Sequence, residues 1–372
     1  MNRPLRVLVG VTSKSWGGNE KWAAEAATGL ARRGHSISVF CSHDPVCGEL
    51  VSRGLAIHRV NLLGDLNPVG FASLLRLLHS ERPDVLLLTK QREYWMGGLS
   101  ARAAGRPLVV LRMGLRRKLR SDLKRRAAFG GLSNLIIVNS RAVRSTLLES
   151  PWIDPSKVEV LLNCVSLEPA REEQGRRALV ELGIPGDCPV VCGAGRLTRQ
   201  KGFDVLIRSF GGVLEEFDSA RLLILGEGGQ RRALEDMACD AGVADSVVFA
   251  GHVSDTRPIL SAVDVYVLSS RNEGMANTLL EAMSVGAPIV ATDVSGTGEA
   301  VTDTVEALIV PPEHTEELAR AVVRLLREPE LARSLGAAAL SRARSQFGEE
   351  RMLDELEGML FTALASRRSR GT

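Results

Sequence analysis

Residues 5–41 read LRVLVGVTSKSWGGNEKWAAEAATGLARRGHSISVFC, and this stretch decides the fold class. Residues 5–12 and 36–41 are short apolar runs, whereas residues 19–34 between them have helical period. Short apolar runs separated by helical segments are typical of strands buried on both faces of a parallel sheet. The stretch therefore predicts a strand, a crossover helix and a second strand parallel to the first.

The predicted helix carries sequence signals along its length and at both ends. Its apolar stripe consists of Trp22, Ala26, Ala27 and Leu30. Asn19 is a candidate for the residue that caps its start, and Gly34 for the residue that ends it.

The same alternation continues along the chain. In the first half we expect further strands at residues 55–60, 84–89, 107–111, 134–139 and 158–162. A second series restarts at residues 190–193 and continues at 221–225, 246–250, 265–269, 288–292 and 307–310. The predicted fold class is α/β, with two Rossmann-like, doubly wound parallel sheets that bind ligands at the carboxyl ends of their strands.

The length of 372 residues predicts two domains, because one domain usually takes about 100–200 residues. The polar stretch 163–186, which contains EPAREEQGRR and GIPGD, is the expected junction. After residue 315 the chain reads as helix with breaks at Pro329 and Gly348. The amphipathic stretch 349–365 must then cover an apolar face.

Composition and charge exclude several classes of protein. Hydrophobic residues make up 45%, charged residues 24% and aromatic residues 4% of the chain, which argues against disorder, a coiled coil and a surface that stacks nucleobases. The net charge of +3 comes from 47 basic and 44 acidic side chains, so no overall field calls for a nucleic-acid partner.

The cysteines predict a reducing compartment. Cys41, Cys47, Cys164, Cys188, Cys192 and Cys239 form no C-x-x-C pair and no His-spaced ligand set, so we expect buried, reduced thiols. We recognise neither a signal peptide nor an apolar run of about 18 residues, and we expect a cytoplasmic protein.

A basic, glycine-containing loop follows the strand expected at residues 190–193. In GAGRLTRQKG (193–202), Gly195 lets the backbone approach an anion, and Arg196 and Lys201 can neutralise a diphosphate at the start of the next helix. The alternative is a solvated basic loop. The glycine spacing does not match G-x-G-x-x-G, which disfavours a nicotinamide-dependent dehydrogenase.

Two carboxylates follow the strand expected at residues 265–269. RNEGMANTLLEAM (271–283) places Glu273 in a Gly-containing loop and Glu281 in a helix. A fully helical connection would separate them by about 12 Å at ~1.5 Å per residue, which exceeds the roughly 5–9.5 Å of a glycosidase pair and suits an extended ligand. The alternative for Glu281 is a capping box with Thr278.

The setting of these glutamates, EGMANTLLEAMSVGAPIVAT (273–292), resembles the signature of the retaining glycosyltransferases of family 4, which have the GT-B fold. GRLTRQKGFDVLI (195–207) is similar to the diphosphate-binding segment of that family. GGNEKW, LGEG, FAGHV and GTGEAV also match, in family order. The resemblance covers most of the chain.

The resemblance implies a donor site in which Arg196, Lys201 and Glu273 are the catalytic residues. Arg196 and Lys201 would hold the donor diphosphate, Glu273 would face the transferred sugar, and Glu281 would bind the ribose hydroxyls. The other implied donor-binding residues are Gly17, Gly18, Gly195, Gly226, His252, Val253, Gly274, Met275, Ala276 and Glu299. For His252 and Glu299 an ordinary loop role is an equal alternative.

The resemblance also implies domain roles and chemistry. Residues 1–165 would form the acceptor-side domain, residues 166–348 the nucleotide-sugar-binding domain, and residues 349–372 a helix that returns to the first domain. We expect no cofactor and no metal, since cations opposite a departing diphosphate stabilise the transition state. Retention is implied by the family alone, and the lack of an evident nucleophile favours same-face attack, with the leaving phosphate as base, over double displacement.

The sequence departs from the family on the acceptor side. Many relatives carry a His after the strand expected at residues 107–111, whereas this chain has Arg112 there, which leaves Lys90 and Arg112 as acceptor-side candidates. A structural salt bridge is the alternative for Arg112. The basic residues of segment 112–126 are Arg112, Arg116, Arg117, Lys118, Arg120, Lys124, Arg125 and Arg126. Such charge on a helix usually marks a solvated face, and the alternatives are contact with anionic lipid or with a phosphorylated acceptor.

The predicted function is transfer of a hexose or N-acetylhexosamine from a UDP- or GDP-sugar to a cell-envelope glycan, such as lipopolysaccharide, or to a lipid-linked acceptor. The expected place is the cytoplasm, including the inner face of the plasma membrane, and no nucleic acid is expected as a partner. One alternative is a nucleotide-sugar 2-epimerase of the same fold. The other is a catalytically silent glycosyltransferase-like partner protein, which the retained Arg196, Lys201, Glu273 and Glu281 disfavour.

Overall fold

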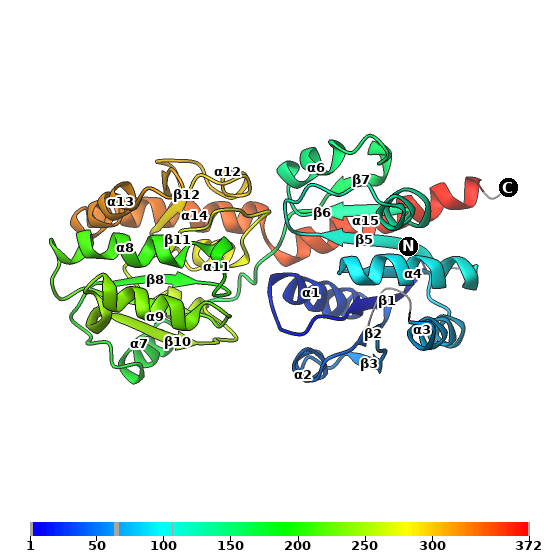
Figure 1. The fold of residues 1–372 in the computed structure, drawn as a ribbon, viewed down its shortest axis with the longest axis horizontal. Helices are drawn as coiled ribbons and strands as arrows, with labels where there is room; N and C mark the ends of the chain where they lie inside the picture. The colour runs from blue at the N-terminus through cyan, green and yellow to red at the C-terminus, as the bar shows by residue number, and fades with distance from the viewer. Residues whose placement is uncertain (1–2, 63–66, 106, 371–372) are drawn as a thin grey trace. The chain divides into compact units, whose positions relative to one another are not determined.

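The computed structural model describes residues 3–62, 67–105 and 107–370, and the chain divides into two compact units (Figure 1). Unit 1 comprises Met1–Asn163 and Glu349–Thr372, and unit 2 comprises Cys164–Gly348. The boundary predicted after residue 165 falls close to this division. Residues 1–2, 63–66, 106 and 371–372 of the predicted domains lie outside the described residues.

Unit 1 is built on a seven-stranded parallel sheet in the order β3-β2-β1-β4-β5-β6-β7. The strands are β1 (Arg6–Val11), β2 (Ser36–Cys41), β3 (Ala56–Arg59), β4 (Val85–Leu88), β5 (Leu108–Met113), β6 (Leu135–Val138) and β7 (Val158–Val160). The helices are α1 (Gly18–Arg32), α2 (Asp44–Ser52), α3 (Pro68–Glu81), α4 (Gln91–Ala104), α5 (Leu123–Arg125), the π-helix Arg126–Leu132, α6 (Arg141–Leu148), the 3₁₀ turn Pro155–Lys157 and α15 (Glu349–Arg370).

Unit 2 is built on a six-stranded parallel sheet in the order β10-β9-β8-β11-β12-β13. The strands are β8 (Val190–Ala194), β9 (Arg221–Leu225), β10 (Val247–Gly251), β11 (Val265–Leu268), β12 (Ile289–Thr292) and β13 (Leu308–Val310). The helices are α7 (Glu172–Glu181), the 3₁₀ turn Arg199–Lys201, α8 (Phe203–Leu214), α9 (Arg231–Asp240), the 3₁₀ turn Ala244–Ser246, α10 (Arg257–Leu260), α11 (Asn277–Ser284), α12 (Thr297–Ala300), α13 (Thr315–Arg327) and α14 (Pro329–Gln346).

Every predicted strand is present, and the α/β fold class with two doubly wound parallel sheets is confirmed. The apolar runs form strands because helices cover both faces of each sheet, so all side chains of a strand such as β4 or β11 are buried. In the sheet of unit 1, β1 lies next to β4, and in unit 2 β8 lies next to β11. These are the two topological switch points, where doubly wound sheets bind ligands.

The first helix differs from its prediction at one end. Its N-cap is Gly17, because the Asn19 side chain donates instead to the carbonyl of Thr89, over 2.6 Å. The prediction that Asn19 caps the start of this helix was therefore wrong. Gly34 does lie just beyond the last turn, with a φ of +88° that only glycine adopts without strain.

The prediction of six buried, reduced thiols was wrong for part of the set. Cys41 and Cys47 form a disulfide, because β2 ends at Cys41 and the short turn into α2 brings the two Cα atoms to 5.8 Å, within disulfide range. Cys239 is exposed and Cys188 is partly exposed, whereas Cys164 and Cys192 are buried free thiols. Burial raises the pKa of the Cys192 thiol, which makes it a poor nucleophile.

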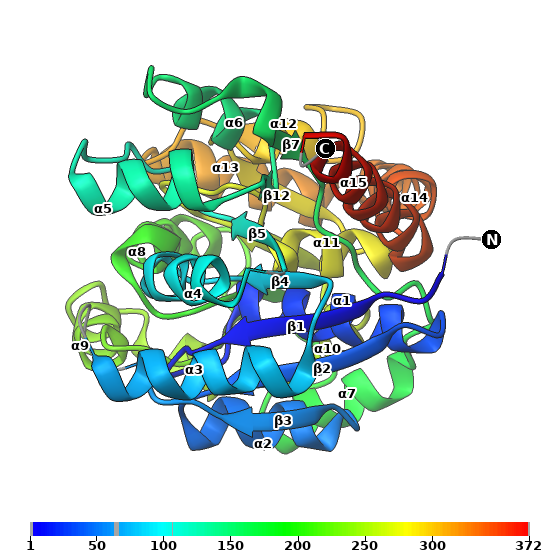
Figure 2. The same ribbon diagram turned by 90° about the vertical axis from the view of Figure 1, so that its right-hand side faces the viewer.

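The C-terminal helix packs on the first helix of unit 1 (Figure 2). Arg33, just after α1, pairs with Glu350, Asp354 and Glu357 of α15. His35 makes a further contact with Glu357, at 2.8 Å. The apolar face of α15, with Met352, Leu353, Leu356 and Leu360, is buried. This stretch thereby covers the apolar face that its amphipathic pattern requires.

The stretch predicted as a polar junction is not entirely irregular. Its residues 172–181 form α7, which packs on α10 of unit 2. Within the part of the chain that the structure describes, no helix is long and apolar enough to span a membrane.

Candidate active site

The three predicted catalytic residues of unit 2 lie on the two loops that flank its switch point. Gly195, Arg196 and Lys201 follow β8, and the loop that begins at Ser269 and carries Glu273 follows β11. Because β8 and β11 are neighbours, their carboxyl ends bring the two loops together at one edge of the sheet.

Lys201 and Glu273 form an ion pair across these loops. The Lys201 Nζ lies 2.7 Å from Glu273 Oε1, and their side chains are 17% and 8% exposed. The Ser270 hydroxyl donates to the same carboxylate oxygen over 2.8 Å. Sequence reasoning selected both residues as ligand contacts but did not predict that they contact each other. The site thus holds a balanced pair of charges that a second anion would perturb.

Gly195 and Gly226 shape the start of the first loop. Gly226 has a φ of +142°, and a Cβ there would lie 1.9 Å from the Gly195 carbonyl oxygen. Only glycine therefore lets the ends of β8 and β9 approach this closely. Arg196, next in the chain, is exposed.

The segment Gly274–Ala276 is buried and leads directly into α11, whose N-cap is Ala276. The alternative for Glu281, a capping box with Thr278, does not hold, because the helix begins at Asn277 and Thr278 lies inside it. The Tyr266 hydroxyl donates to Thr278, and the Thr256 hydroxyl donates to Glu281 over 2.5 Å. Glu281 is therefore a buried carboxylate held by Thr256, a residue that the sequence reasoning missed.

The remaining unit 2 candidates lie further along the same edge. His252 and Val253 follow β10, with His252 exposed and Val253 partly exposed. Glu299 lies in the short helix α12 after β12, and its carbonyl accepts a hydrogen bond from Arg342.

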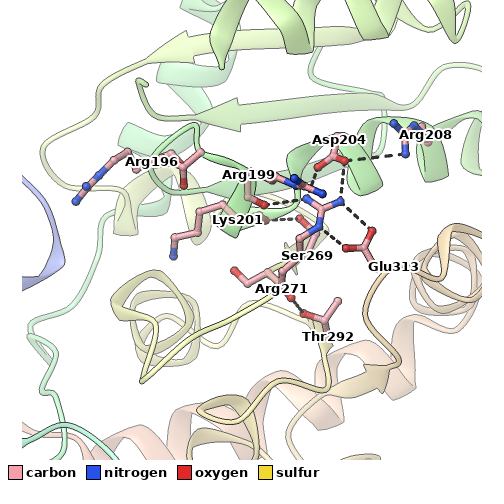
Figure 3. Close-up of polar contacts among 11 residues, drawn as sticks. Arg196, Arg199, Lys201, Asp204, Arg208, Ser269, Arg271, Thr292 and Glu313 are labelled. Carbon is pink, nitrogen blue, oxygen red and sulfur yellow. Dashed lines mark hydrogen bonds and ion pairs between the residues drawn. The ribbon is translucent and has the colours of Figure 1, made fainter. Parts of the chain in front are cut away.

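Arg271 is the residue of this site that sequence reasoning missed most plainly (Figure 3). Its guanidinium donates to both carboxylate oxygens of Asp204, over 2.6 and 2.7 Å, and to both of Glu313. It also donates to the Arg199 carbonyl over 2.8 Å. A carboxylate partner at a distance of tens of residues leaves no signal in the local sequence.

The charges in this cluster change each other's protonation. Hydrogen bonds to Asp204 and then to Glu313 raise the pKa of Arg271. The hydrogen bond from Arg271 lowers the pKa of Glu313. Burial of Asp204 acts to raise its pKa, but the hydrogen bond and the positive charge of Arg271 lower it overall. All three groups are charged at neutral pH.

The switch point of unit 1 carries a second ion pair. The Lys90 Nζ, after β4, lies 2.5 Å from Oε1 of Glu20, in the first turn of α1. The Ser13 hydroxyl, after β1, donates to the same oxygen. Gly17 and Gly18, the predicted donor-phosphate glycines, lie between Ser13 and Glu20, at the N-terminus of α1.

Glu93 holds the two loops of the unit 1 switch point together. Its buried carboxylate accepts from the backbone N–H and the hydroxyl of Thr12, and from the N–H groups of Thr89 and Lys90, over 2.6–3.0 Å. Burial raises the pKa of Glu93, although these hydrogen bonds oppose the shift. Sequence reasoning missed this residue too, since its partners lie at the ends of two different strands.

Arg112 does not lie on an exposed basic segment. Its side chain is 1% exposed, stacks on Trp22 with 4.4 Å between the guanidinium carbon and the ring centroid, and donates to Asn163 Oδ1 over 2.6 Å. The expectation of a membrane contact through Arg112 was therefore wrong, because β5 buries this residue within unit 1. The segment after it is irregular up to α5 rather than helical.

No metal centre is formed by the described residues: they contain no group of three or more His, Cys, Asp or Glu side chains able to hold a metal ion.

Comparison with known proteins identifies both units. Residues 188–328 match the family model described as "Glycosyl transferases group 1", and residues 16–169 match "Glycosyltransferase Family 4". The lipopolysaccharide core biosynthesis glycosyltransferase LpsE of Rhizobium meliloti is 30% identical over 236 residues, 63% of this chain and 66% of LpsE, so the match spans slightly less than two thirds of that relative. A D-inositol 3-phosphate glycosyltransferase of Saccharomonospora viridis is 28% identical over 96% of this chain and 91% of its own length.

Solved structures share the architecture. Anabaena Alr3699/HepE, crystallised in complex with UDP-glucose, superimposes with a TM-score of 0.86 at 20% identity, over 96% of this chain and all of that one. Both units, their sheets and the family matches agree, and the chain belongs to the group 1, family 4 glycosyltransferases with the GT-B fold.

Proposed function

We propose that this chain is a retaining glycosyltransferase that moves a hexose or N-acetylhexosamine from a UDP- or GDP-sugar to a cell-envelope glycan or a lipid-linked acceptor. The observation that carries the proposal is the Lys201–Glu273 pair at the switch point of unit 2, where a GT-B chain places its nucleotide-binding loops. The UDP-glucose complex of Anabaena HepE supports a nucleotide-sugar donor.

The donor diphosphate would bind beside Lys201. Its negative charge competes with Glu273 for the lysine ammonium, so the Glu273 carboxylate becomes available to accept hydrogen bonds from hydroxyls of the transferred sugar. The exposed Arg196 side chain and the N–H groups of Gly274, Met275 and Ala276, next to the N-terminus of α11, supply further positive potential. Glu281, held by Thr256, would accept from the ribose hydroxyls.

These cations also set the proposed chemistry. As the bond between the sugar and the diphosphate breaks, negative charge grows on the leaving phosphate, and preorganised cations stabilise it. Lys201 and Arg196 would fill the role that a metal ion has in other transferases. We favour same-face attack with the leaving phosphate as base over a Glu273 nucleophile, because the Glu273 carboxylate would accept hydrogen bonds from the Ser270 hydroxyl and from the sugar hydroxyls.

The acceptor class follows from the relatives and from the surface of unit 1. LpsE is named for biosynthesis of the lipopolysaccharide core, which supports an acceptor of the cell envelope. The glycosyltransferase of Saccharomonospora viridis is named for an inositol phosphate, which supports an anionic acceptor. Lys90, which is one third exposed, is the proposed acceptor-side cation. The exposed basic residues between Gly114 and Arg126 would hold the chain near anionic lipid.

A panel of nucleotide sugars tests the proposal. The parent protein should show a thermal shift with one UDP- or GDP-sugar, and the shift should be lost in Lys201→Ala and kept in Arg324→Ala, which removes an exposed ion pair on α13. Transfer should need an acceptor, retain the anomeric configuration by NMR, and persist in EDTA. Formation of a new sugar nucleotide without acceptor would instead show a 2-epimerase, and binding without any product would show a silent partner protein.

A further inference from the structure

We propose that Arg271 is a positioning residue of the donor site, which sets the separation of Lys201 and Glu273 without touching the donor itself. The inference rests on the proposed function, because it assigns a role relative to a bound diphosphate. Arg271 lies two positions before Glu273 in the chain, and its guanidinium points toward Asp204 of α8 and Glu313 (Figure 3).

The guanidinium joins three segments that are far apart in the sequence. It binds Asp204 in the first turn of α8, Glu313 in the loop after β13, and the Arg199 carbonyl in the turn that ends at Lys201. Four of these contacts are paired, two to each carboxylate, which is the planar geometry that arginine provides and lysine cannot. Arg271 therefore connects the turn that ends at Lys201, the start of α8 and the loop after β13 to its own loop.

Further hydrogen bonds connect the two loops next to Lys201 and Glu273. The Arg271 N–H donates to the Gln200 carbonyl over 2.8 Å, and the Gln200 side chain donates to the Asn272 carbonyl over 2.7 Å. Gln200 adjoins Lys201, and Asn272 adjoins Glu273. Hydrogen bonds therefore join the two loops immediately beside the ion pair, and the Ser269 hydroxyl also donates to the Lys201 carbonyl.

Glu313 has an uncommon backbone conformation, which it shares with Arg82 and Thr304. Its φ of +69° lies in the left-handed region, where glycine or asparagine is favoured. A strained residue whose side chain binds Arg271 at an active-site edge is the kind of outlier that points to function.

A double-mutant cycle on nucleoside diphosphate binding tests the inference. Affinity for UDP, GDP, ADP and dTDP is measured by calorimetry for the full chain, and the tightest of them is followed through Arg271→Met, Lys201→Ala and the double variant. We expect Arg271→Met to weaken binding about tenfold and the double variant to bind no more weakly than Lys201→Ala alone, because coupled residues are not additive. Arg327→Ala, which removes an exposed pair with Glu216, should bind like the parent.

Chemical rescue separates positioning from a general loss of folding. Millimolar guanidinium should restore most of the diphosphate affinity of Arg271→Ala, because it can occupy the space between Asp204 and Glu313, whereas ethylammonium at the same concentration should not. Arg271→Lys should remain as weak as Arg271→Met. If the affinity losses of Arg271→Met and Lys201→Ala multiply in the double variant, the inference is wrong. It is also wrong if guanidinium does not restore the affinity of a folded Arg271→Ala variant. Either result would leave the proposed function intact. Failure of the parent to bind any of the four diphosphates would overturn the proposed function and the inference with it.

Discussion

Lys201 is the proposed diphosphate contact, and its replacement should affect stability as well as binding. Glu273 is 8% exposed, and Lys201 is its ion-pair partner. Lys201→Ala should leave this carboxylate buried without its counter-charge and destabilise the protein by about 1–3 kcal/mol. Urea denaturation of the full chain measures this. In a solvated basic loop the same change would affect folding little, and the ion pair is the reason to expect a loss of stability.

The control for this prediction neutralises the stranded carboxylate. In the background of Lys201→Ala, the change Glu273→Gln should recover part of the lost stability, because a neutral amide costs less to bury than an unpaired carboxylate. It should not recover nucleotide binding. If the single variant is as stable as the parent, then solvent rather than Lys201 satisfies Glu273, and the ion pair is not a feature of the site.

The pair of carboxylates around Arg271 predicts a dependence of stability on pH. The pKa of Asp204 lies below its ordinary 3.8 and that of Glu313 below its ordinary 4.5, so the unfolded chain binds more protons than the folded one in this range. Their stabilisation should be complete above about pH 5 and disappear as the pH falls through the folded-state values. Denaturation curves of the parent should show this acid loss, and Arg271→Met should flatten it. Equal slopes in the two proteins would contradict the assignment.

At the level of elements, the turn that joins the Lys201 loop to α8 has no room for a side chain. Gly202 has a φ of +66°, and a Cβ there would lie 2.0 Å from the Ser269 carbonyl oxygen at the end of β11. Gly202→Ala should therefore destabilise the protein by about 2 kcal/mol or more and weaken nucleotide binding. Gly211→Ala, in the same helix and with no atom within 4 Å of its Cβ, should instead stabilise by about 0.5–1 kcal/mol. Melting temperatures that move in the same direction for both would contradict this account.

The basic segment after β5 predicts contact with anionic membranes. Arg117, Arg120 and Arg126 are exposed, and Leu123 beside them is 86% exposed. Each well-placed cation should favour anionic over neutral vesicles by about 1 kcal/mol, with the preference falling as salt rises. Vesicle sedimentation of Arg117→Glu/Arg120→Glu should lose the preference, whereas Arg324→Glu in unit 2 should keep it. Equal sedimentation of the parent with both vesicle types at low salt would remove the membrane proposal.

Apolar runs predict the elements of this fold well, because burial on both faces leaves a strand such as β9 few alternatives. Local sequence predicts less about contacts between elements. The loops that carry Lys201 and Glu273 were identified from their residue types, but their ion pair depends on β8 and β11 being neighbours in the sheet. The contact of Arg112 with Trp22 likewise joins β5 to a residue of α1 that is 90 positions earlier in the chain, and no spacing within either segment encodes it.

At the level of the whole molecule, the two units use the same device. Each sheet reverses its strand order between two central strands, and in each a lysine after one of those strands pairs with a glutamate from the other loop or its helix. The pairs are Lys90 with Glu20 in unit 1 and Lys201 with Glu273 in unit 2. In this chain we therefore propose two separate positions at which an anionic or hydroxyl-bearing ligand would compete for a lysine.

The two separate ion pairs predict that replacing Lys201 impairs use of the donor, whereas replacing Lys90 impairs use of the acceptor. Lys201→Ala should weaken binding of the nucleoside diphosphate, whereas Lys90→Ala should leave that affinity within about twofold and lower transfer to acceptor by about 10–100-fold, since Lys90 is proposed to contact the acceptor. Calorimetry with the bare diphosphate and a transfer assay at saturating donor measure the two effects separately. Because Lys90→Ala also strands the buried Glu20 carboxylate, Lys90→Ala/Glu20→Gln serves as the stability-matched control. If Lys90→Ala weakens diphosphate binding as strongly as Lys201→Ala does, both lysines serve the donor and the acceptor site must be sought elsewhere in unit 1.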